Sequence, residues 1–204
     1  MKLFPNPKTL IFSKEKMNSK KISKVVSSFD EHFNNLLYQM FEVNKKEGML
    51  LIIEKSDDIT NDEGYKIKIE KDVITIVAKQ PNGAFYGLIT LRDILNSDNE
   101  MCLEIEDYPD LTVRGIMLDI SRSKVPTLDT LKELVVMFAT LRYNHLELYI
   151  EGFSFEYQSF RHLLNDKNYL CLKDYLELEK FAQEYYIDFV PNQNGFGHMS
   201  DWLA

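Results

Sequence analysis

Three apolar segments in the second half of the chain end in polar residues that can do chemistry. The segments are 113–121, 145–151 and 187–194. Their polar ends include Asp119, Glu151 and Asn192, and His198 follows the third segment. Carboxylates and imidazoles exchange protons, and amides bind hydroxyl groups. When such segments are parallel strands separated by helices, ligands bind where the strands end, so the pattern is typical of an enzyme built on an α/β barrel.

The segment 145–151 separates its side chains by parity. Leu146, Leu148 and Ile150 point to one side of a strand, and His145, Glu147, Tyr149 and Glu151 point to the other. We favour an apolar set that packs on helices and a polar set that faces a barrel interior, because the neighbouring strands are apolar. An edge strand with its polar face in water is the alternative. His145 and Glu147 have a spacing compatible with metal ligands, but two ligands on one strand are weak evidence, so we predict no metal site and no cofactor.

A stretch of about twenty residues without clear helical or strand periodicity follows Glu151. Loops of this length in compact domains are often functional, and this one leaves a strand end. Its aromatic side chains can offer flat faces to a sugar ring or pack the loop onto the barrel rim: Phe153, Phe155, Tyr157 and Phe160. We expect the packing role for at least two of them. Further on, Gly195 and Gly197 allow a tight turn that can aim His198 inward, and a structural role for this histidine is equally open.

Two expected helices separate these strands, one at about 127–142, opened by Thr127, and one at 172–186. Strands that alternate with helices through short connections are parallel, with right-handed crossovers. About three such units fit into 111–204, whereas a TIM barrel has eight. We therefore expect the N-terminal portion of a (β/α)8 catalytic barrel, an incomplete α/β (TIM-type) barrel truncated at the chain end.

The first 107 residues have the pattern of an α+β domain. We expect strands at 9–13, 50–55, 65–70, 73–79 and 102–106, of which 65–70 and 73–79 form a hairpin. Apolar residues that recur from Ile22 to Phe41 predict one amphipathic helix, and the turn signal at Pro81 opens a second. Pro109 interrupts the pattern, so we predict two domains, 1–107 and 111–204.

Composition limits the function classes. The net charge of -8 argues against nucleic acid, and the basic run from Lys14 to Lys24 is expected to be the solvated face of a helix start. Cys102 and Cys171 are too few for a disulfide framework. No segment has the continuous apolar character of a secretory signal or a membrane span. We therefore expect a soluble, cytoplasmic protein with no membrane partner.

Several short motifs together carry a resemblance to a known family. They are GAFYGLITLR at 83–92, RGIMLDISR at 114–122, NHLELY at 144–149, and Pro191 with the pair Gly197-His198. From about residue 60 to its end, the chain resembles glycoside hydrolase family 20, the β-N-acetylhexosaminidases. The resemblance implies a small α+β domain before a (β/α)8 barrel and a carbohydrate substrate with a terminal N-acetylhexosamine. It also implies that Arg114 hydrogen-bonds sugar hydroxyls and that His198 lies at the active site, which completes a predicted substrate-binding set with Asp119, Glu151 and Asn192.

The chain departs from the family pattern at two strand ends. Tyr149-Ile-Glu-Gly-Phe153 stands where the family usually has His-Leu-Thr-Asp-Asp, and Pro191-Asn-Gln-Asn194 stands where it has Pro-Glu-x-Asp. The family's catalytic Asp-Glu pair follows a fourth barrel strand, which would lie beyond Ala204. In that chemistry the substrate's own acetamido oxygen attacks the anomeric carbon and the configuration is retained.

These departures predict an atypical branch of the family. We expect no catalytic residue within this chain and no activity of the chain alone. The alternative is a non-catalytic carbohydrate-binding or interaction protein on the same scaffold. Three strands of a barrel also leave an open parallel edge, which predicts self-association.

Overall fold

The structure is a computed structural model that describes the chain except residues 45, 122–123, 165–168 and 204, and except the side chains of 201–202. The chain divides into two compact units, 1–110 and 111–204, which are described separately. Among the described helices, none combines the length and the apolar character that crossing a membrane requires.

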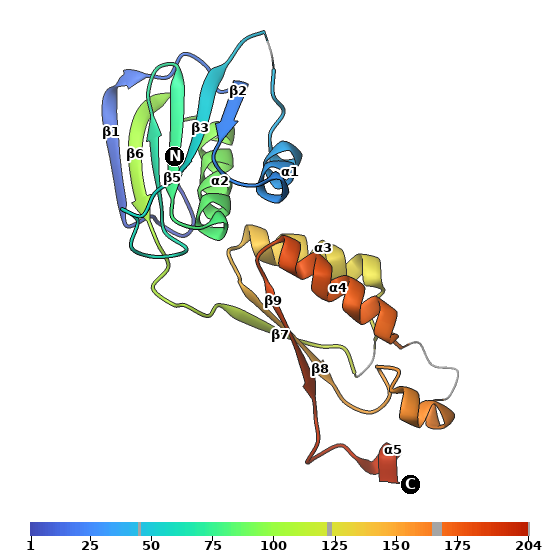
Figure 1. Ribbon diagram of the computed structural model, residues 1–204. Helices are drawn as coiled ribbons and strands as arrows, with labels where there is room; N and C mark the ends of the chain where they lie inside the picture. Colours follow the sequence, from blue (N-terminus) through green and yellow to red (C-terminus); the bar gives the residue numbers. More distant parts are fainter. Residues whose placement is uncertain (45, 122–123, 165–168, 204) are drawn as a thin grey trace. The chain divides into compact units, whose positions relative to one another are not determined.

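The first unit is a six-stranded mixed sheet with two helices (Figure 1). Its strands are β1 (Thr9–Lys16), β2 (Ile22–Ser27), β3 (Met49–Lys55), β4 (Tyr65–Ile69), β5 (Val73–Ala78) and β6 (Met101–Asp107), in the order β1-β6-β4-β5-β3-β2. Strand β3 is parallel to β2 and β5, and the other pairs are antiparallel. Helix α2 (Pro81–Asn96) packs on β4 and β5, and α1 (Glu31–Met40) packs beside α2. The predicted α+β character of this region is confirmed.

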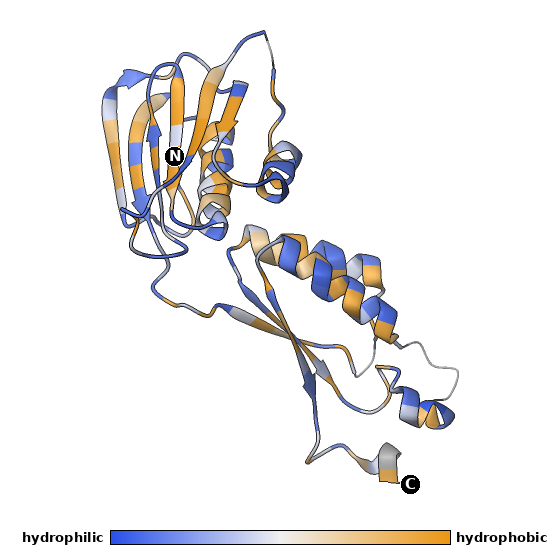
Figure 2. Ribbon diagram, in the orientation of Figure 1, coloured by the Kyte–Doolittle hydropathy of each residue, from blue (hydrophilic) through white to orange (hydrophobic). Residues whose placement is uncertain are grey.

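Apolar residues of the first unit form one core between the sheet and α2. Strands β3 and β5 are predominantly apolar (Figure 2), as expected for strands in the interior of a sheet. The predicted hairpin is confirmed, because β4 and β5 pair antiparallel. Helix α2 begins at Pro81, whose fixed φ suits a first helical turn. A Cβ atom on Gly83 would lie 2.6 Å from the carbonyl oxygen of Gly64, so the helix start packs directly on backbone.

The prediction of one helix from Ile22 to Phe41 is wrong at its start. The first part of this segment is β2, which pairs with β3, and only the second part is α1. Asp30 separates the two, because its carboxylate accepts a hydrogen bond from the Phe33 backbone N–H at 2.9 Å and caps the helix. The β-branched residues of β2 repeat at a spacing that also fits a helical stripe. The basic run 14–24 therefore lies on β1, the following turn and β2, not at a helix start.

The second unit is a parallel sheet of three described strands with the order β7-β8-β9. The strands are β7 (Gly115–Asp119), β8 (His145–Ile150) and β9 (Asp188–Gln193). The helices are α3 (Leu128–Thr140), α4 (Leu172–Glu184), a short α5 (Ser200–Leu203) and the 3₁₀ helix η1 (Gln158–Leu163). Helices α3 and α4 lie side by side over one face of the sheet (Figure 1). The predicted alternation of strand and helix is confirmed in this region.

The central strand β8 shows why this unit has one apolar and one polar face. Leu146, Leu148 and Ile150 are each at most 2% exposed, whereas the alternate residues are only half-buried. The predicted division of the strand by parity is confirmed. Because β8 pairs with β7 on one side and β9 on the other, the alternative of an edge strand is wrong. The polar face of the sheet is therefore the one that α3 and α4 leave uncovered.

Candidate functional site

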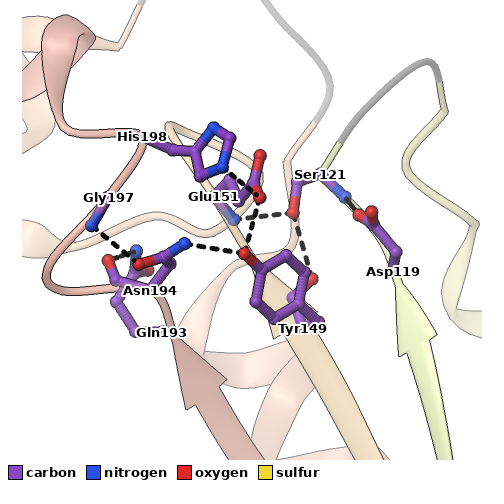
Figure 3. Close-up of polar contacts among 8 residues, drawn as sticks. All are labelled: Asp119, Ser121, Tyr149, Glu151, Gln193, Asn194, Gly197 and His198. Carbon is purple, nitrogen blue, oxygen red and sulfur yellow. Dashed lines mark hydrogen bonds and ion pairs between the residues drawn. The ribbon is translucent and has the colours of Figure 1, made fainter.

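The polar face gathers side chains from the carboxyl ends of all three strands of the second unit. Asp119, Tyr149 and Asn192 are direct neighbours across β7, β8 and β9, so they lie on the same face of the sheet. The chain continues from these strand ends into Glu151 after β8 and into the segment around His198 after β9. Figure 3 shows that the side chains of Tyr149, Glu151 and His198 point toward one another.

Glu151 is the centre of this cluster. Its Oε1 atom accepts a hydrogen bond from the Tyr149 hydroxyl at 2.5 Å and lies 3.5 Å from Nε2 of His198. The Glu151 side chain is 11% exposed, whereas the His198 side chain is 57% exposed. The pair is an ion pair only when the imidazole is protonated. A buried carboxylate beside an exposed imidazole can accept hydrogen bonds from a ligand and can exchange a proton with it.

Asn194 connects β8 to the turn that carries His198. Its Nδ2 atom donates to the Tyr149 hydroxyl oxygen at 2.7 Å, and its Oδ1 atom accepts from the Gly197 backbone N–H at 3.1 Å. His198 has a φ of 55°, a left-handed conformation that costs a residue other than glycine of order 1 kcal/mol. The surrounding hydrogen bonds hold the turn in this conformation, which directs the imidazole toward Glu151 (Figure 3).

Ser121 joins the ends of β7 and β8. Its backbone N–H donates to the Asp119 carboxylate at 2.8 Å, and its hydroxyl donates to the Tyr149 carbonyl at 3.1 Å. The same hydroxyl oxygen accepts from the Glu151 backbone N–H at 2.6 Å. These bonds fix the direction in which the chain leaves β8 and thus the position of the Glu151 side chain. Asp119 is therefore a member of the cluster that is connected to Tyr149 and Glu151 through Ser121.

Asn192 lies on the same face of the sheet as the cluster, but its side chain contacts β8 and not the cluster. Its Nδ2 atom donates to Oε1 of Glu147 at 2.5 Å, and Glu147 lies two residues before Tyr149 on β8. The structure therefore brings Asn192 near the predicted site but gives it a partner one step closer to the amino-terminal end of the sheet. The described residues include no group of three or more His, Cys, Asp or Glu side chains arranged to hold a metal ion.

Arg114 lies apart from the other predicted residues. It precedes β7, at the amino-terminal end of the strand, while Asp119 ends the strand. Its guanidinium donates to the backbone carbonyls of Arg142 and Leu111, each at 2.7 Å. A bulge at Gly115, which would let Arg114 face the site with Asp119, is not present, because the register of β7 with β8 is regular. The structure thus places Arg114 at the opposite end of β7 from the cluster.

The long connection after β8 packs through its aromatic side chains. Phe155 lies 4.9 Å from Tyr157 and 5.3 Å from Tyr175 of α4, measured between ring centroids, and Tyr175 lies 4.7 Å from Phe189 of β9. The expected packing role is therefore confirmed for Phe155 and Tyr157. The Tyr157 hydroxyl also donates to Oε1 of Gln193 at 2.8 Å, and burial raises its pKa.

Sequence reasoning identified three members of the cluster and missed three others. Asp119, Glu151 and His198 were predicted, while Ser121, Tyr149 and Asn194 were not included in the substrate-binding set. The parity of β8 placed Tyr149 on the polar face, which was a usable signal. The roles of Ser121 and Asn194 depend on hydrogen bonds between strand ends that are about 30 and 45 residues apart in sequence, and no local pattern indicates them.

Comparisons with known proteins identify a family, relatives and solved structures that this chain resembles. Residues 1–108 match the sequence profile of Glycosyl hydrolase family 20, domain 2. The beta-hexosaminidase of Porphyromonas gingivalis is 36% identical over 87 residues, which are 37% of this chain and 11% of that protein. Beta-hexosaminidase subunit A2 of Dictyostelium discoideum is 29% identical over 175 residues, which are 75% of this chain and 31% of that subunit.

Solved structures extend the likeness to the whole fold. The crystal structure of beta-N-acetylhexosaminidase from Bacteroides fragilis has a TM-score of 0.81 at 19% sequence identity, and the match covers 98% of this chain and 46% of that one. The chain thus spans less than a third of these two curated relatives and less than half of the solved structure. Because the family profile matches 108 of its 204 residues, the chain belongs to glycosyl hydrolase family 20.

Proposed function

We propose that this chain supplies part of the sugar-binding site of a β-N-acetylhexosaminidase. In the complete protein, terminal N-acetylhexosamine is removed by substrate-assisted, retaining hydrolysis. The observation that carries the proposal is the cluster of Asp119, Glu151 and His198 at the carboxyl ends of parallel strands, in a chain that belongs to family 20. In this chemistry the substrate's acetamido oxygen is the nucleophile, and an Asp-Glu pair orients it and protonates the leaving group.

The cluster suits the recognition of a sugar. Carboxylates accept hydrogen bonds from pairs of hydroxyl groups, and an imidazole can donate or accept. Glu151 and His198 come from different strand ends but approach to 3.5 Å, so one sugar ring can contact both. Asp119 lies at the neighbouring strand end and extends the polar surface. Asn192 donates a hydrogen bond to Glu147. We therefore assign it to the residues that support the sugar-binding side chains from the sheet.

Two features of the second unit support a proposal that it forms the first strands of a (β/α)8 barrel. Its described strands are parallel and follow one another in chain order, and helices α3 and α4 cover the apolar face. The opposite face carries the polar cluster and also Met117, which is 59% exposed. In a closed barrel, further strands would cover this face and pair with β9. We therefore propose that the isolated chain self-associates through these surfaces.

Light scattering tests this proposal directly. A concentration-dependent increase in mass is expected, together with slow hydrogen exchange on the outer edge of β9. A monodisperse monomer at high concentration, with protected amides throughout 113–193, would contradict it.

A non-catalytic carbohydrate-binding protein is the second candidate. It is favoured by Asn192 and Asn194, because amides stand at a strand end where the family resemblance places carboxylates. Amides bind sugar hydroxyls but exchange no protons under ordinary conditions. This candidate predicts binding of N-acetylhexosamines without turnover.

One experiment separates the candidates. The complete gene product is assayed for hydrolysis of 4-nitrophenyl N-acetyl-β-D-glucosaminide and of the corresponding galactosaminide, as the unaltered protein, as Glu151→Gln and as His198→Gln. Glu133→Gln, an exposed carboxylate on α3, is the matched control. We expect hydrolysis that falls at least about tenfold in the two site variants, because each loses charge or a proton at the sugar, and that is unchanged in the control.

The other outcomes are equally informative. The protein could bind N-acetylglucosamine without hydrolysing the substrates, and Glu151→Gln could weaken that binding. This result would support the non-catalytic binding protein and contradict the enzyme. Neither binding nor hydrolysis of either sugar would overturn the proposed function.

A further inference from the structure

The turn before His198 determines the direction of the hydrogen bonds that connect Asn194, Tyr149 and Glu151. The Gly197 backbone N–H can only donate, and it donates to the side chain of Asn194 at 3.1 Å. The atom of Asn194 that faces it must therefore be the amide oxygen. If the amide were turned over, its NH₂ group would face the Gly197 N–H, donor against donor. The other amide atom, 2.7 Å from the Tyr149 hydroxyl oxygen, is accordingly the nitrogen.

This orientation determines the roles of the next two groups. Because the amide nitrogen of Asn194 donates to the Tyr149 oxygen, the single hydroxyl proton of Tyr149 is available for another acceptor. That acceptor is Oε1 of Glu151 at 2.5 Å, the oxygen that His198 approaches to 3.5 Å. The bonds form a ring that runs from Gly197 through Asn194, Tyr149 and Glu151 to His198, one residue beyond its start (Figure 3).

We infer that Asn194 and Tyr149 are a matched pair of positioning residues, which hold Glu151 and His198 in place for the sugar. The match requires an amide at position 194, because Tyr149 already donates its proton to a carboxylate and can only accept from its other neighbour. An aspartate at 194, the residue type that the family resemblance places there, would set lone pairs of two oxygens against each other. The catalytic part of this inference rests on the proposed function, but the pairing itself does not.

The pairing also affects the charge of the site. Among the described residues, the carboxylates and the imidazole of the cluster are Asp119 and Glu151 from the strand ends and His198 from the turn. An aspartate at 194 would add a third carboxylate to the cluster, after Asp119 and Glu151. It would lie close to Glu151, and like charges at such distances repel. The neutral amide connects β8 to the turn without this repulsion. The substitution of a carboxylate by an amide therefore follows from the presence of tyrosine at 149.

A double-mutant cycle tests the pairing. The variants are Asn194→Asp, Tyr149→Phe and the double variant, with Glu133→Gln as an exposed control. In the complete protein, Asn194→Asp is expected to lower kcat/KM about tenfold or more when Tyr149 is present. It is expected to lower it less than about threefold when residue 149 is phenylalanine, because the opposing oxygen is then absent. Equal factors in the two backgrounds would overturn the inference.

Measurements without substrate keep this test independent of the proposed function. In this 204-residue chain, the same cycle on urea unfolding should show that Asn194→Asp destabilises only the protein with Tyr149. Hydrogen exchange of the Gly197 amide should stay slow in Asn194→Asp, whose carboxylate still accepts, and become fast in Asn194→Ala. If Asn194→Ala leaves the exchange of Gly197 unchanged, the ring is not the support of the turn and the inference fails. If only the activity arm fails because no hydrolysis occurs in any variant, the proposed function is wrong and the pairing stands.

Discussion

Arg114→Lys distinguishes a structural from a sugar-binding arginine. In the structure, the guanidinium donates from Nε to the Arg142 carbonyl and from Nη1 to the Leu111 carbonyl, each at 2.7 Å. The first of these carbonyls lies just beyond the end of α3, where a helix favours a positive charge. A lysine keeps the charge but has no planar fork, so it cannot reproduce both bonds. The substitution should therefore loosen the amino-terminal ends of β7 and β8.

The expected magnitude follows from these bonds. A hydrogen bond from a charged donor contributes about 1.5–3 kcal/mol when buried, and Arg114 is half-exposed, so we expect a loss of about 1–2 kcal/mol. For a domain of about 100 residues, each kcal/mol lowers the melting temperature by about 4–8 °C. Differential scanning calorimetry should show a decrease of that size, and hydrogen exchange at β7 and β8 should become faster.

The control is Arg161→Lys, because the Arg161 side chain is 74% exposed where it contacts Glu156 at 2.8 Å in an ion pair. Such pairs contribute about 0–1 kcal/mol, so the control should change little. The family resemblance implies a different result for Arg114→Lys. If the melting temperature and exchange were unchanged while hydrolysis by the complete protein fell sharply, Arg114 would be a sugar ligand and our structural argument would be refuted.

Three further predictions concern packing and capping. Gly83→Ala should destabilise the first unit by about 1–3 kcal/mol in urea, because its Cβ would lie 2.6 Å from the Gly64 carbonyl oxygen; an unchanged midpoint would contradict the close approach. Tyr65→Phe should cost about 1–3 kcal/mol, since its hydroxyl donates at 2.9 Å to the buried carboxylate of Asp107, and a variant as stable as the unaltered protein would refute that role.

The Cys171 thiol and the Cys171 backbone N–H both hydrogen-bond to the Asp174 carboxylate at the start of α4, and these bonds lower the pKa of Asp174. The stabilising effect of Asp174 is therefore present above the ordinary carboxyl pKa and is lost as pH falls through the lowered value. Asp174→Asn should therefore reduce the loss of unfolding free energy on acidification, and an identical pH profile would exclude this contribution.

Local sequence patterns predicted those features of the fold that depend on residues adjacent in the sequence. The division of β8 by parity required only the two-residue period of a strand, and the start of α2 at Pro81 required only the preference of proline for a first helical turn. Helix α3 begins where Thr127 accepts a hydrogen bond from the Thr130 backbone N–H, as its side chain predicts. Each of these features is determined within a few residues, so a single sequence contains the whole signal.

Patterns failed where two distant segments decide the structure. The segment after Ile22 has apolar residues at a spacing that fits a helix, but it becomes β2 because β3 offers a parallel partner about 27 residues further along the chain. The motif and the residue type of Arg114 predict a role at the sugar, which stays a prediction, but they do not show that the regular register of β7 with β8 places Arg114 at the opposite strand end from Asp119. Register between strands is a property of the folded sheet, and no window of sequence contains it.

The same limit explains which half of the candidate site the sequence could predict. Asp119, Glu151 and His198 were identified because polar residues at strand ends are a local signal. Their arrangement depends on the direction of hydrogen bonds, which begins at one backbone N–H and passes through Asn194 and Tyr149 before it reaches the carboxylate. By residue type alone, the amide of Asn194 is only the replacement of a carboxylate that the family pattern has at this position. Read with its neighbours, it is the donor that a tyrosine already bound to a carboxylate requires, so its departure from the family pattern is a consequence of another departure on the adjacent strand.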